Sequence, residues 1–339
     1  MIQFDNDYTR GMHPRILKRL TETNMEQAPG YGVDRYCENA ANHIKKACNN
    51  PDIDVHFLVG GTLVNLTVIG ASLRSHEAVI APSTGHIFTS ETGAIEATGH
   101  KVLAIPTETG KIKADQIEEI LAKPENVHAP KPGMIYLSQS TEFGGVYTKA
   151  ELQAIRKLAD QYDVPLFIDG ARLGQAMAAH DCDVTLEDMA ELCDVFYIGG
   201  TKVGALFGEA VVITNDKLKK EFRYLMKQRG GLFAKGRILG VQFEEMFKDG
   251  LYFEVSKYAV DMAMKIKEAV LLAGFKLAHP VVTNLLFVEL TYEQFEKLSE
   301  KYIFNPWEEH ENHVVARICT DWSTLPEHVE ALIEDLKGL

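Results

Sequence analysis

Short apolar runs alternate with amphipathic stretches through the first two-thirds of the chain. The apolar runs are rich in Val, Ile and Phe, and they predict β-strands at residues 54–59, 78–81, 101–105, 133–137, 166–168, 195–198 and 210–213. The stretches between several of them predict helices at residues 62–73, 88–97, 114–121 and 149–162. Alternating strands and helices favour an α/β fold, and continuous apolar strands favour a mostly parallel sheet covered on both faces.

The pattern changes after about residue 215. A long helix is predicted at 250–273, followed by strands and helices at 285–290, 292–301, 314–319 and 326–336. This order predicts a smaller C-terminal α/β domain packed beside the large one. We therefore divide the chain into an N-terminal arm (1–14), a large domain (15–245) and a small domain (246–339).

Composition narrows the function classes. The 339 residues are 46% apolar, which is enough for the cores of two domains. The net charge is −13 and no Lys/Arg-rich block occurs, so nucleic acid and anionic membranes are poor partners. No apolar run is long enough to span a membrane, and the first residues do not resemble a signal peptide. Five scattered cysteines without a C-x-x-C pair favour neither disulfides nor zinc, and fit a reducing cytoplasm.

Two of the predicted strands end at residues with useful chemistry. Asp169 ends the strand at 166–168, and Lys202 follows the strand at 195–198. In open α/β sheets, ligands gather at the carboxyl ends of the strands. A lysine and an aspartate there suit pyridoxal phosphate (PLP), because lysine forms a Schiff base with it and aspartate pairs with its pyridinium nitrogen. The alternatives are a helix-capping Asp169 and a surface Lys202, but the apolar neighbours of Lys202 argue against exposure.

A phosphate site is predicted at Gly60-Gly61-Thr62, between a strand and a helix. Backbone N–H groups at a helix start bind phosphate, and glycines allow close approach. The Thr62 hydroxyl adds a further donor. An ordinary strand-to-helix turn is the alternative. Because this segment is not a G-x-G-x-x-G motif, a nicotinamide cofactor is disfavoured.

His86 and Arg317 each have two interpretations. His86 opens a predicted helix, as a partly exposed polar residue or as a ring that stacks on the cofactor and holds a proton near the substrate. Arg317 lies inside an apolar strand, where a buried arginine needs an anionic partner. That partner is either a carboxylate of the protein or the carboxylate of a substrate.

Taken together, these residues resemble the low-specificity threonine aldolase group of the β-eliminating lyase family, over nearly the whole chain. The most specific motifs are Asp169-Gly-Ala-Arg172-Leu and Gly200-Thr201-Lys202. The others follow in the family's order: Phe4-x-Asn6-Asp7, Tyr31-Gly-x-Asp34, Gly61-Thr62-x-x-Asn65, His86 with Glu91-x-Gly-Ala94, Gly230-Gly231 and Arg317. The resemblance implies the aspartate aminotransferase fold, called fold type I, with PLP as the cofactor.

The resemblance also implies how the cofactor is held. Lys202 would form the Schiff base, and Asp169 would pair with the ring nitrogen. His86 would stack on the ring, and Gly61 and Thr62 would bind the phosphate.

On the substrate side, the resemblance assigns Arg172, Arg317 and Asn6 to the substrate carboxylate, although related enzymes usually carry serine where this chain has Asn6. Active sites of the family lie at subunit interfaces, which implies a homo-oligomer, either a dimer or a tetramer. Tyr31 and Lys235 would then reach the cofactor of a neighbouring subunit.

One segment departs from the family pattern. Many members carry a histidine within a Thr-His-Asn-Gly stretch, and the matching segment here, residues 140–144, has Glu142 in its place. An ionised carboxylate only accepts hydrogen bonds, so its contact with a substrate hydroxyl differs from that of histidine. Both the identity of the base and the preference for threonine or allo-threonine stay open.

The predicted activity is cleavage of L-threonine, L-allo-threonine or a related β-hydroxy-α-amino acid to glycine and an aldehyde. Held by its carboxylate, the substrate presents its Cα–Cβ bond for cleavage, while His86, Glu142 or an ordered water takes the hydroxyl proton. Another PLP-dependent β-elimination or a transamination on the same scaffold is the nearest alternative. More distant alternatives are a non-catalytic relative and a metal-dependent aldolase, but no metal-binding spacing is found.

Overall fold

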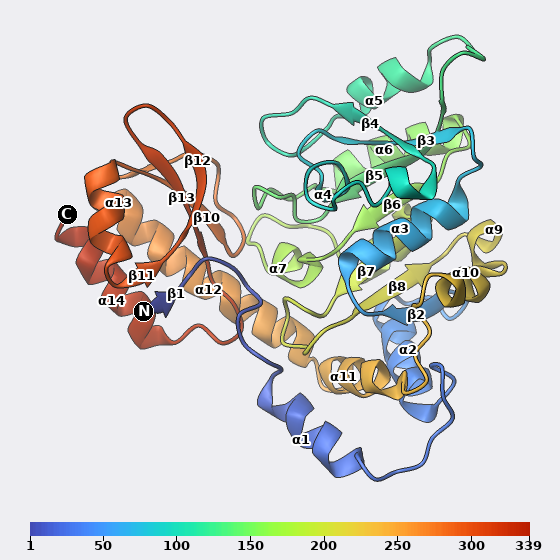
Figure 1. Ribbon diagram of the computed structural model, residues 1–339, viewed down its shortest axis with the longest axis horizontal. Coiled ribbons are helices and arrows are strands. Elements are labelled where there is room, and N and C mark those ends of the chain that lie inside the picture. Colours follow the sequence, from blue (N-terminus) through green and yellow to red (C-terminus); the bar gives the residue numbers. More distant parts are fainter.

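A seven-stranded sheet forms the centre of the larger body of the protein in the computed structural model, which describes residues 1–339 (Figure 1). In spatial order its strands are β2 (Asp54–Leu58), β8 (Glu209–Ile213), β7 (Val195–Gly199), β6 (Leu166–Asp169), β5 (Lys131–Ser138), β3 (Glu77–Pro82) and β4 (Lys101–Ile105). The strand β8 runs antiparallel to both of its neighbours, β2 and β7, and all the other pairs are parallel. The predicted α/β fold with a mostly parallel sheet is confirmed.

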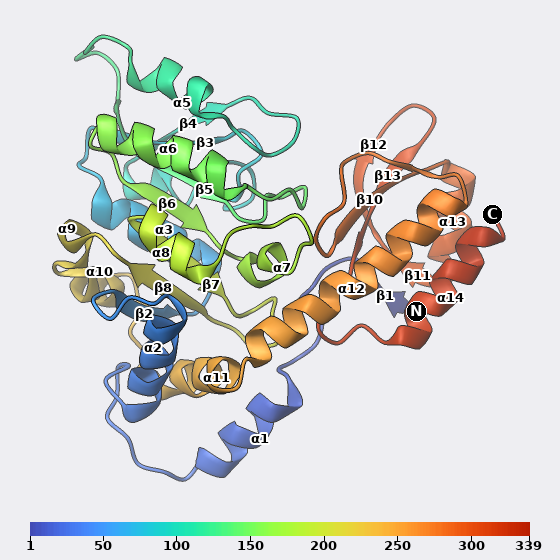
Figure 2. The same ribbon diagram turned by 180° about the vertical axis from the view of Figure 1, so that it is seen from behind.

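Helices cover both faces of this sheet. On one face, which Figure 1 shows in front, lie α3 (Gly61–Ser72) and α10 (Phe222–Gln228). The other face, in front in Figure 2, carries α6 (Lys149–Gln161) and α8 (Leu186–Leu192). The remaining helices of this body are α1 (Pro14–Thr23), α2 (Arg35–Ala47), α4 (His86–Thr89), α5 (Ala114–Leu121), α7 (Leu173–Met177), α9 (Asp216–Lys219) and α11 (Arg237–Lys248).

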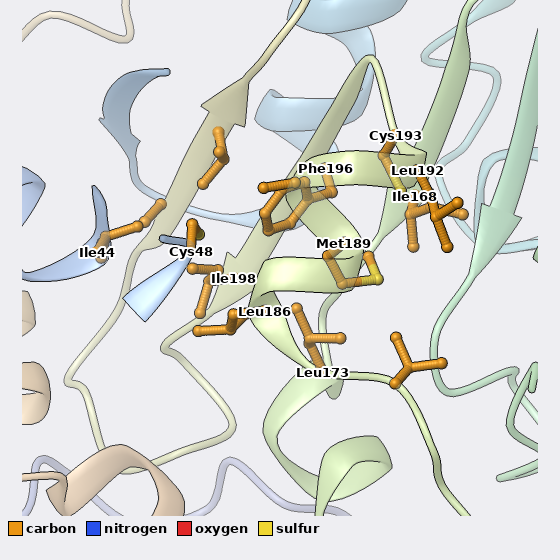
Figure 3. Packing of buried hydrophobic residues seen from close by; sticks show 14 of the residues in the cluster. Ile44, Cys48, Ile168, Leu173, Leu186, Met189, Leu192, Cys193, Phe196 and Ile198 are labelled. Carbon is orange, nitrogen blue, oxygen red and sulfur yellow. The ribbon is translucent and has the colours of Figure 1, made fainter. Parts of the chain in front are cut away.

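Side chains along β7 alternate between two hydrophobic clusters. Phe196 and Ile198 pack with Leu186 and Met189 of α8 on one face of the sheet, as Figure 3 shows. Tyr197 points to the opposite face and joins the cluster under α3. Because both faces of the strand are buried, its sequence is apolar throughout, and this is the pattern from which it was predicted.

The smaller body contains a four-stranded antiparallel sheet next to three helices. Its strands, in spatial order, are β12 (Asn305–Glu309), β13 (Val314–Cys319), β10 (Leu285–Leu290) and β9 (Lys276–Leu277). The helices are α12 (Leu251–Leu272), α13 (Tyr292–Ser299) and α14 (Pro326–Lys337), and α12 reaches across from the larger body (Figure 1). The predicted domain boundary at residue 246 falls within α11 and stays a prediction.

The N-terminal arm is built into the smaller body. Its first strand, β1 (Ile2–Gln3), pairs in parallel with β11 (Tyr302–Ile303), and Phe4 is buried in the core of that body. The chain then passes toward the larger body, where α1 begins. Residues 5–7 therefore lie between the two bodies, a position that becomes important at the active site.

Most predicted elements are confirmed to within a few residues, but the single helix at 88–97 is wrong. The chain instead forms the short α4 and a 3₁₀ turn, η1 (Glu96–Thr98). Between them, Thr92 and Gly93 adopt left-handed backbone angles (φ 53° and 71°), which a helix does not permit. None of the helices combines the length and apolar character needed to cross a membrane.

Candidate active site

Lys202 lies in the turn that follows β7, next to the carboxyl end of β6. Burial and the Arg172 guanidinium lower the pKa of Lys202, while Asp7, Asp169 and Glu209 act in the opposite direction. The charges of these four residues therefore act on the amine. No carboxylate forms an ion pair with Lys202 within 4.0 Å. A lysine with a lowered pKa and no ion-pair partner is a competent nucleophile.

Asp169 is buried at the end of β6 and accepts hydrogen bonds from four donors. Its Oδ2 atom accepts from the Tyr136 hydroxyl (2.6 Å) and from Asn65 Nδ2 (3.1 Å). The Oδ1 atom accepts from the Tyr197 hydroxyl and from the backbone N–H of Ala171. These four hydrogen bonds fix the orientation of the carboxyl group. The helix-capping alternative accounts for only the Ala171 contact.

The start of α3 is a further element of the site. This helix begins at Gly61 after Gly60, and no side chain caps it. The N–H groups of its first turn are thus available to an anion. A Cβ atom added at Gly61 would lie 2.9 Å from the hydroxyl of Tyr197, the same hydroxyl that donates to Asp169. The Gly61-Thr62 segment and Asp169 are therefore connected through one tyrosine.

His86 joins the same network. Its Nδ1 atom lies 2.8 Å from Oε1 of Glu91, and that oxygen also accepts from Asn65 Nδ2 at 2.7 Å. Asn65 in turn donates to Asp169. The hydrogen bond to Glu91 raises the pKa of His86. The imidazole keeps 43% of its side-chain surface exposed, so part of the ring is accessible to a ligand.

Glu142 lies beside His86 in the segment after β5. Its Oε1 atom accepts from the backbone N–H of His86 (3.0 Å) and from the Ser138 hydroxyl (2.8 Å). Its Oε2 atom is buried and has no hydrogen-bond partner. Burial raises the pKa of the Glu142 carboxyl group. An acceptor atom without a donor, on a carboxyl group with a raised pKa, is suited to receive a proton.

Arg172 is engaged by the N-terminal arm. Its Nε and Nη2 atoms donate to the two carboxylate oxygens of Asp7 at 2.6 and 3.1 Å, and Asn284 donates to Asp7 as well. Burial tends to raise the pKa of Asp7, but the positive charges of Arg172 and Lys202 prevail and hold it at about 2. Binding of a substrate carboxylate by Arg172 stays a prediction, since Asp7 already occupies the guanidinium.

We expect the substitution Asp7→Asn to destabilise the protein by about 3 kcal/mol at pH 7, because it leaves Arg172 buried without a counter-charge. The wild-type carboxylate contributes this stability above its ordinary pKa of 3.8 and loses it as the pH falls toward about 2. The difference between the two proteins should therefore shrink by roughly 1 kcal/mol at pH 3. Urea unfolding of the wild type and the variant at pH 7 and pH 3 measures this difference in the free energy of unfolding. Asp181→Asn, at an exposed carboxylate beside His180, is the matched control and should change neither value.

Arg317 has no carboxylate partner, which removes the salt-bridge alternative. Its Nη2 atom donates to the backbone carbonyl of Asp5 (2.9 Å), its guanidinium lies 4.9 Å from the centre of the Trp307 ring, and its Nε atom is buried without a partner. Asp5 and Asp7 of the arm thus contact Arg317 and Arg172 respectively. Asn6, between them, donates to the Asp5 side chain and accepts from the backbone of Tyr8.

Tyr31 and Lys235 do not join this group within one chain. Tyr31 is 46% exposed, and its ring lies 4.6 Å from the amine of Lys227. It lines a separate cavity together with Arg223 and Phe233. A contact of Tyr31 or Lys235 with the cofactor of a neighbouring subunit stays a prediction.

Sequence reasoning assigned no role to several residues of the site. Tyr136 and Tyr197 look like ordinary apolar strand positions, and only the register of β5 and β7 against β6 reveals their contact with Asp169. Glu209 of β8 is buried and accepts from Gly200 N and from the Thr201 hydroxyl, so it fixes the turn that carries Lys202. A carboxylate inside an apolar run was the signal that could have singled it out.

The residues of this site fit PLP. A basic amine, a fixed carboxylate and an uncapped helix start match its aldehyde, ring nitrogen and phosphate. Buried polar atoms without partners also remain here: Asn65 Oδ1, Glu91 Oε2, Glu142 Oε2 and Arg317 Nε. Such atoms are rare in folded proteins unless a ligand or water satisfies them. The structure groups no three His, Cys, Asp or Glu side chains that could bind a metal ion.

The fold and these site residues define an enzyme of fold type I that depends on PLP. The model of the beta-eliminating lyase family matches residues 5–293, and the chain belongs to this family. It is a PLP-dependent lyase, as the sequence predicted. The aspartate aminotransferase of Thermus thermophilus, with 15% identity and a TM-score of 0.74 over 100% of this chain and 91% of that one, shares the fold alone.

More similar proteins include three threonine aldolases. The low specificity L-threonine aldolases of Pseudomonas sp. (strain NCIMB 10558) and Pseudomonas aeruginosa are 30% and 31% identical, each over 99% of this chain and 97% of theirs. The structure of Leishmania major threonine aldolase is 43% identical, with a TM-score of 0.98 over 100% of this chain and 99% of that one.

Proposed function

We propose that the protein is an aldolase that cleaves L-threonine or a related β-hydroxy-α-amino acid to glycine and an aldehyde. The observation that carries the proposal is the guanidinium of Arg317, which has no carboxylate partner and donates to the backbone carbonyl of Asp5. The same N-terminal arm carries Asp7, which pairs with Arg172. The guanidinium of Arg317 offers an anion site for the carboxylate of an amino acid. The similarity to threonine aldolases over almost the full length supports the choice of reaction.

Each end of the cofactor has a residue to hold it. Lys202 would bind its aldehyde covalently, Asp169 would accept from its ring nitrogen, and the first turn of α3, with Gly61 and Thr62, would hold its phosphate. The exposed part of His86 would lie against its ring. When bound, PLP accepts the electron pair left on Cα after the bond to Cβ breaks.

Glu142 is the residue we propose as the base for the β-hydroxyl proton. Its Oε2 atom is buried and unpartnered, and its raised pKa brings it closer to neutral pH. His86 is less suited, because its hydrogen bond to Glu91 raises its pKa and favours the protonated imidazolium. A protonated His86 would instead donate toward the substrate. Ser138 and the backbone of His86 hold Glu142 in place.

Product analysis with L-threonine tests the proposed reaction. Purified protein loaded with PLP is incubated with L-threonine, L-allo-threonine and phenylserine in turn. We expect glycine and the matching aldehyde in equal amounts. Ammonia with a 2-oxo acid would instead identify a β-eliminating lyase, and a requirement for an oxo-acid acceptor would identify an aminotransferase. Absence of any reaction together with failure to take up PLP would point to a non-catalytic relative.

Replacing Arg317 with alanine should raise the KM for L-threonine about 10- to 100-fold, because a charge-assisted hydrogen bond to the substrate carboxylate is lost. The effect on kcat should be smaller, since the residue acts mainly in binding. Arg317→Lys keeps the positive charge but loses the bidentate geometry of the guanidinium. Its KM should therefore lie between those of the wild type and the alanine variant. Steady-state kinetics measure both constants. An unchanged KM in the alanine variant would remove Arg317 from the substrate site.

We further propose that the chain forms a homo-oligomer, a dimer or tetramer, and acts in the cytoplasm. Exposed Tyr31, Val33 and Phe233 surround one cavity, and a second subunit could cover them. The free state of all five cysteines is compatible with a reducing compartment. The proposed partner of the site is a small amino-acid substrate. Light scattering at several protein concentrations tests the assembly.

A further inference from the structure

The segment of residues 140–145 connects the two bodies of the protein. On the side of the large sheet, Glu142 of this segment contacts Ser138 and the backbone of His86. On the side of the small sheet, the carbonyl of Gly144 accepts from the hydroxyl of Thr283 at 3.1 Å. A Cβ atom at Gly144 would lie 2.7 Å from that hydroxyl, and its φ of +77° also requires glycine. The contact between segment and small body is therefore close and specific.

Phe143 anchors this segment in an aromatic cluster of the small body. Its ring stacks on His279 with 4.1 Å between the centroids, and meets Phe287 and Trp307 edge-on at 5.8 and 6.1 Å. Phe287 and Trp307 also contact each other, at 5.5 Å. These three partners come from the loop before β10, from β10 and from β12. Edge-on and offset contacts of this kind fix the relative orientation of the rings.

The aromatic cluster continues directly to Arg317. The guanidinium of Arg317 lies 4.9 Å from the centre of the Trp307 ring, and Arg317 stands opposite Phe287 in the pairing of β10 with β13. An aromatic face holds a guanidinium without neutralising its charge, so Arg317 remains able to bind an anion. Contacts therefore run from Glu142 through its neighbour Phe143 and Trp307 to Arg317.

We propose that Phe143 is a positioning residue that holds Arg317 in register with Glu142 and thereby sets the affinity for the substrate carboxylate. The inference rests on the proposed function, in which Arg317 binds the carboxylate and Glu142 meets the β-hydroxyl of the same molecule. Glu142 lies in the segment after β5 of the large sheet and Arg317 lies in β13 of the small sheet, and the Phe143 ring packs between the two bodies. A displacement of about 1 Å at such a site is enough to cost a large factor in rate or affinity.

A double-mutant cycle on Phe143 and Arg317 tests this coupling. The wild type, Phe143→Leu, Arg317→Ala and the double variant are loaded with PLP, and their affinity for glycine is measured by spectral titration. We expect Phe143→Leu to weaken glycine binding about 10-fold in the wild-type background and less than about 2-fold when Arg317 is already alanine. The KM for L-threonine should rise in parallel, and Phe143→Tyr should restore affinity to within about 2-fold of wild type, because it keeps the ring.

A matched control is Phe295→Leu. Phe295 is a partly buried ring of the same small body that packs on Phe304, away from Arg317. It should leave glycine affinity unchanged. If Phe143→Leu does not fold, Phe143→Met replaces it in the same cycle with the same expected coupling to Arg317.

The outcomes separate this inference from the proposed function. An equal loss of glycine affinity in both backgrounds would mean that the aromatic contact does not act through Arg317, and would overturn the positioning role alone. A similar loss in Phe295→Leu would show a general effect of small-body stability and would also overturn it. If Arg317→Ala itself leaves glycine affinity unchanged, the substrate contact fails, and the positioning role fails with it.

Discussion

Replacement of Lys202 by alanine is expected to reduce turnover of L-threonine by at least about 10⁴-fold, which is the scale of losing a covalent catalytic residue. Lys202 is the amine on which the charges of Asp169, Asp7 and Arg172 act, and burial together with Arg172 lowers its pKa, which favours the nucleophilic form. No other residue described at this site supplies a primary amine. Formation of acetaldehyde, followed in a coupled assay, measures the loss.

The control for this variant is Lys157→Ala, at an exposed position of α6. It should keep wild-type turnover. The Lys202 variant should still fold, because no hydrogen bond or ion pair of the Lys202 side chain is lost with it, and its far-ultraviolet circular dichroism should match the wild type. Retention of more than a few per cent of wild-type activity in a folded Lys202→Ala protein would exclude Lys202 as the residue that carries the cofactor.

The second large effect is expected for Glu142→Gln, which should lower kcat about 10²- to 10³-fold with little change in KM. The amide keeps the size of the side chain but cannot take a proton. As a base, Glu142 must be deprotonated, so wild-type activity should fall as the pH drops through its pKa. Burial places that pKa above the ordinary value of 4.5, and this acid limb should disappear in the variant. Profiles of kcat against pH measure both features.

His86→Gln distinguishes the two candidate bases. If Glu142 is the base, the His86 variant keeps an acid limb that reports Glu142, although its overall rate falls because the ring contact with the cofactor is gone. Glu108→Gln, at an exposed carboxylate, serves as the control and should behave as wild type. If Glu142→Gln retains kcat within about 3-fold and keeps its acid limb, the base is another group.

Much of the large sheet could be predicted from sequence, because its strands are buried on both faces and so read as continuous apolar runs. The same reasoning located Lys202 and Asp169, since residues at the carboxyl ends of adjacent parallel strands meet at one edge of the sheet. The helix at 88–97 was predicted wrongly, because apolar spacing gives no sign of the left-handed angles at Thr92 and Gly93.

Contacts between distant segments could not be predicted. Asp7 and Arg172 are 165 positions apart, and no local pattern indicates that their side chains form an ion pair. The sequence indicates Arg317 as a candidate anion-binding residue only because it interrupts an apolar strand. Its stacking on Trp307 depends on how β12 and β13 pair. The packing of the arm into the smaller body likewise depends on the pairing of β1 with β11, each of which is two residues long.

The most direct test of the account is to identify the residue that binds the cofactor. The PLP-loaded protein is reduced with borohydride, digested and mapped by mass spectrometry. We predict a pyridoxyl group on Lys202 alone, and its loss when L-threonine is present in excess during reduction. A pyridoxyl group on a different lysine, or none on a protein that still cleaves threonine, would contradict the assignment of these residues as the catalytic site.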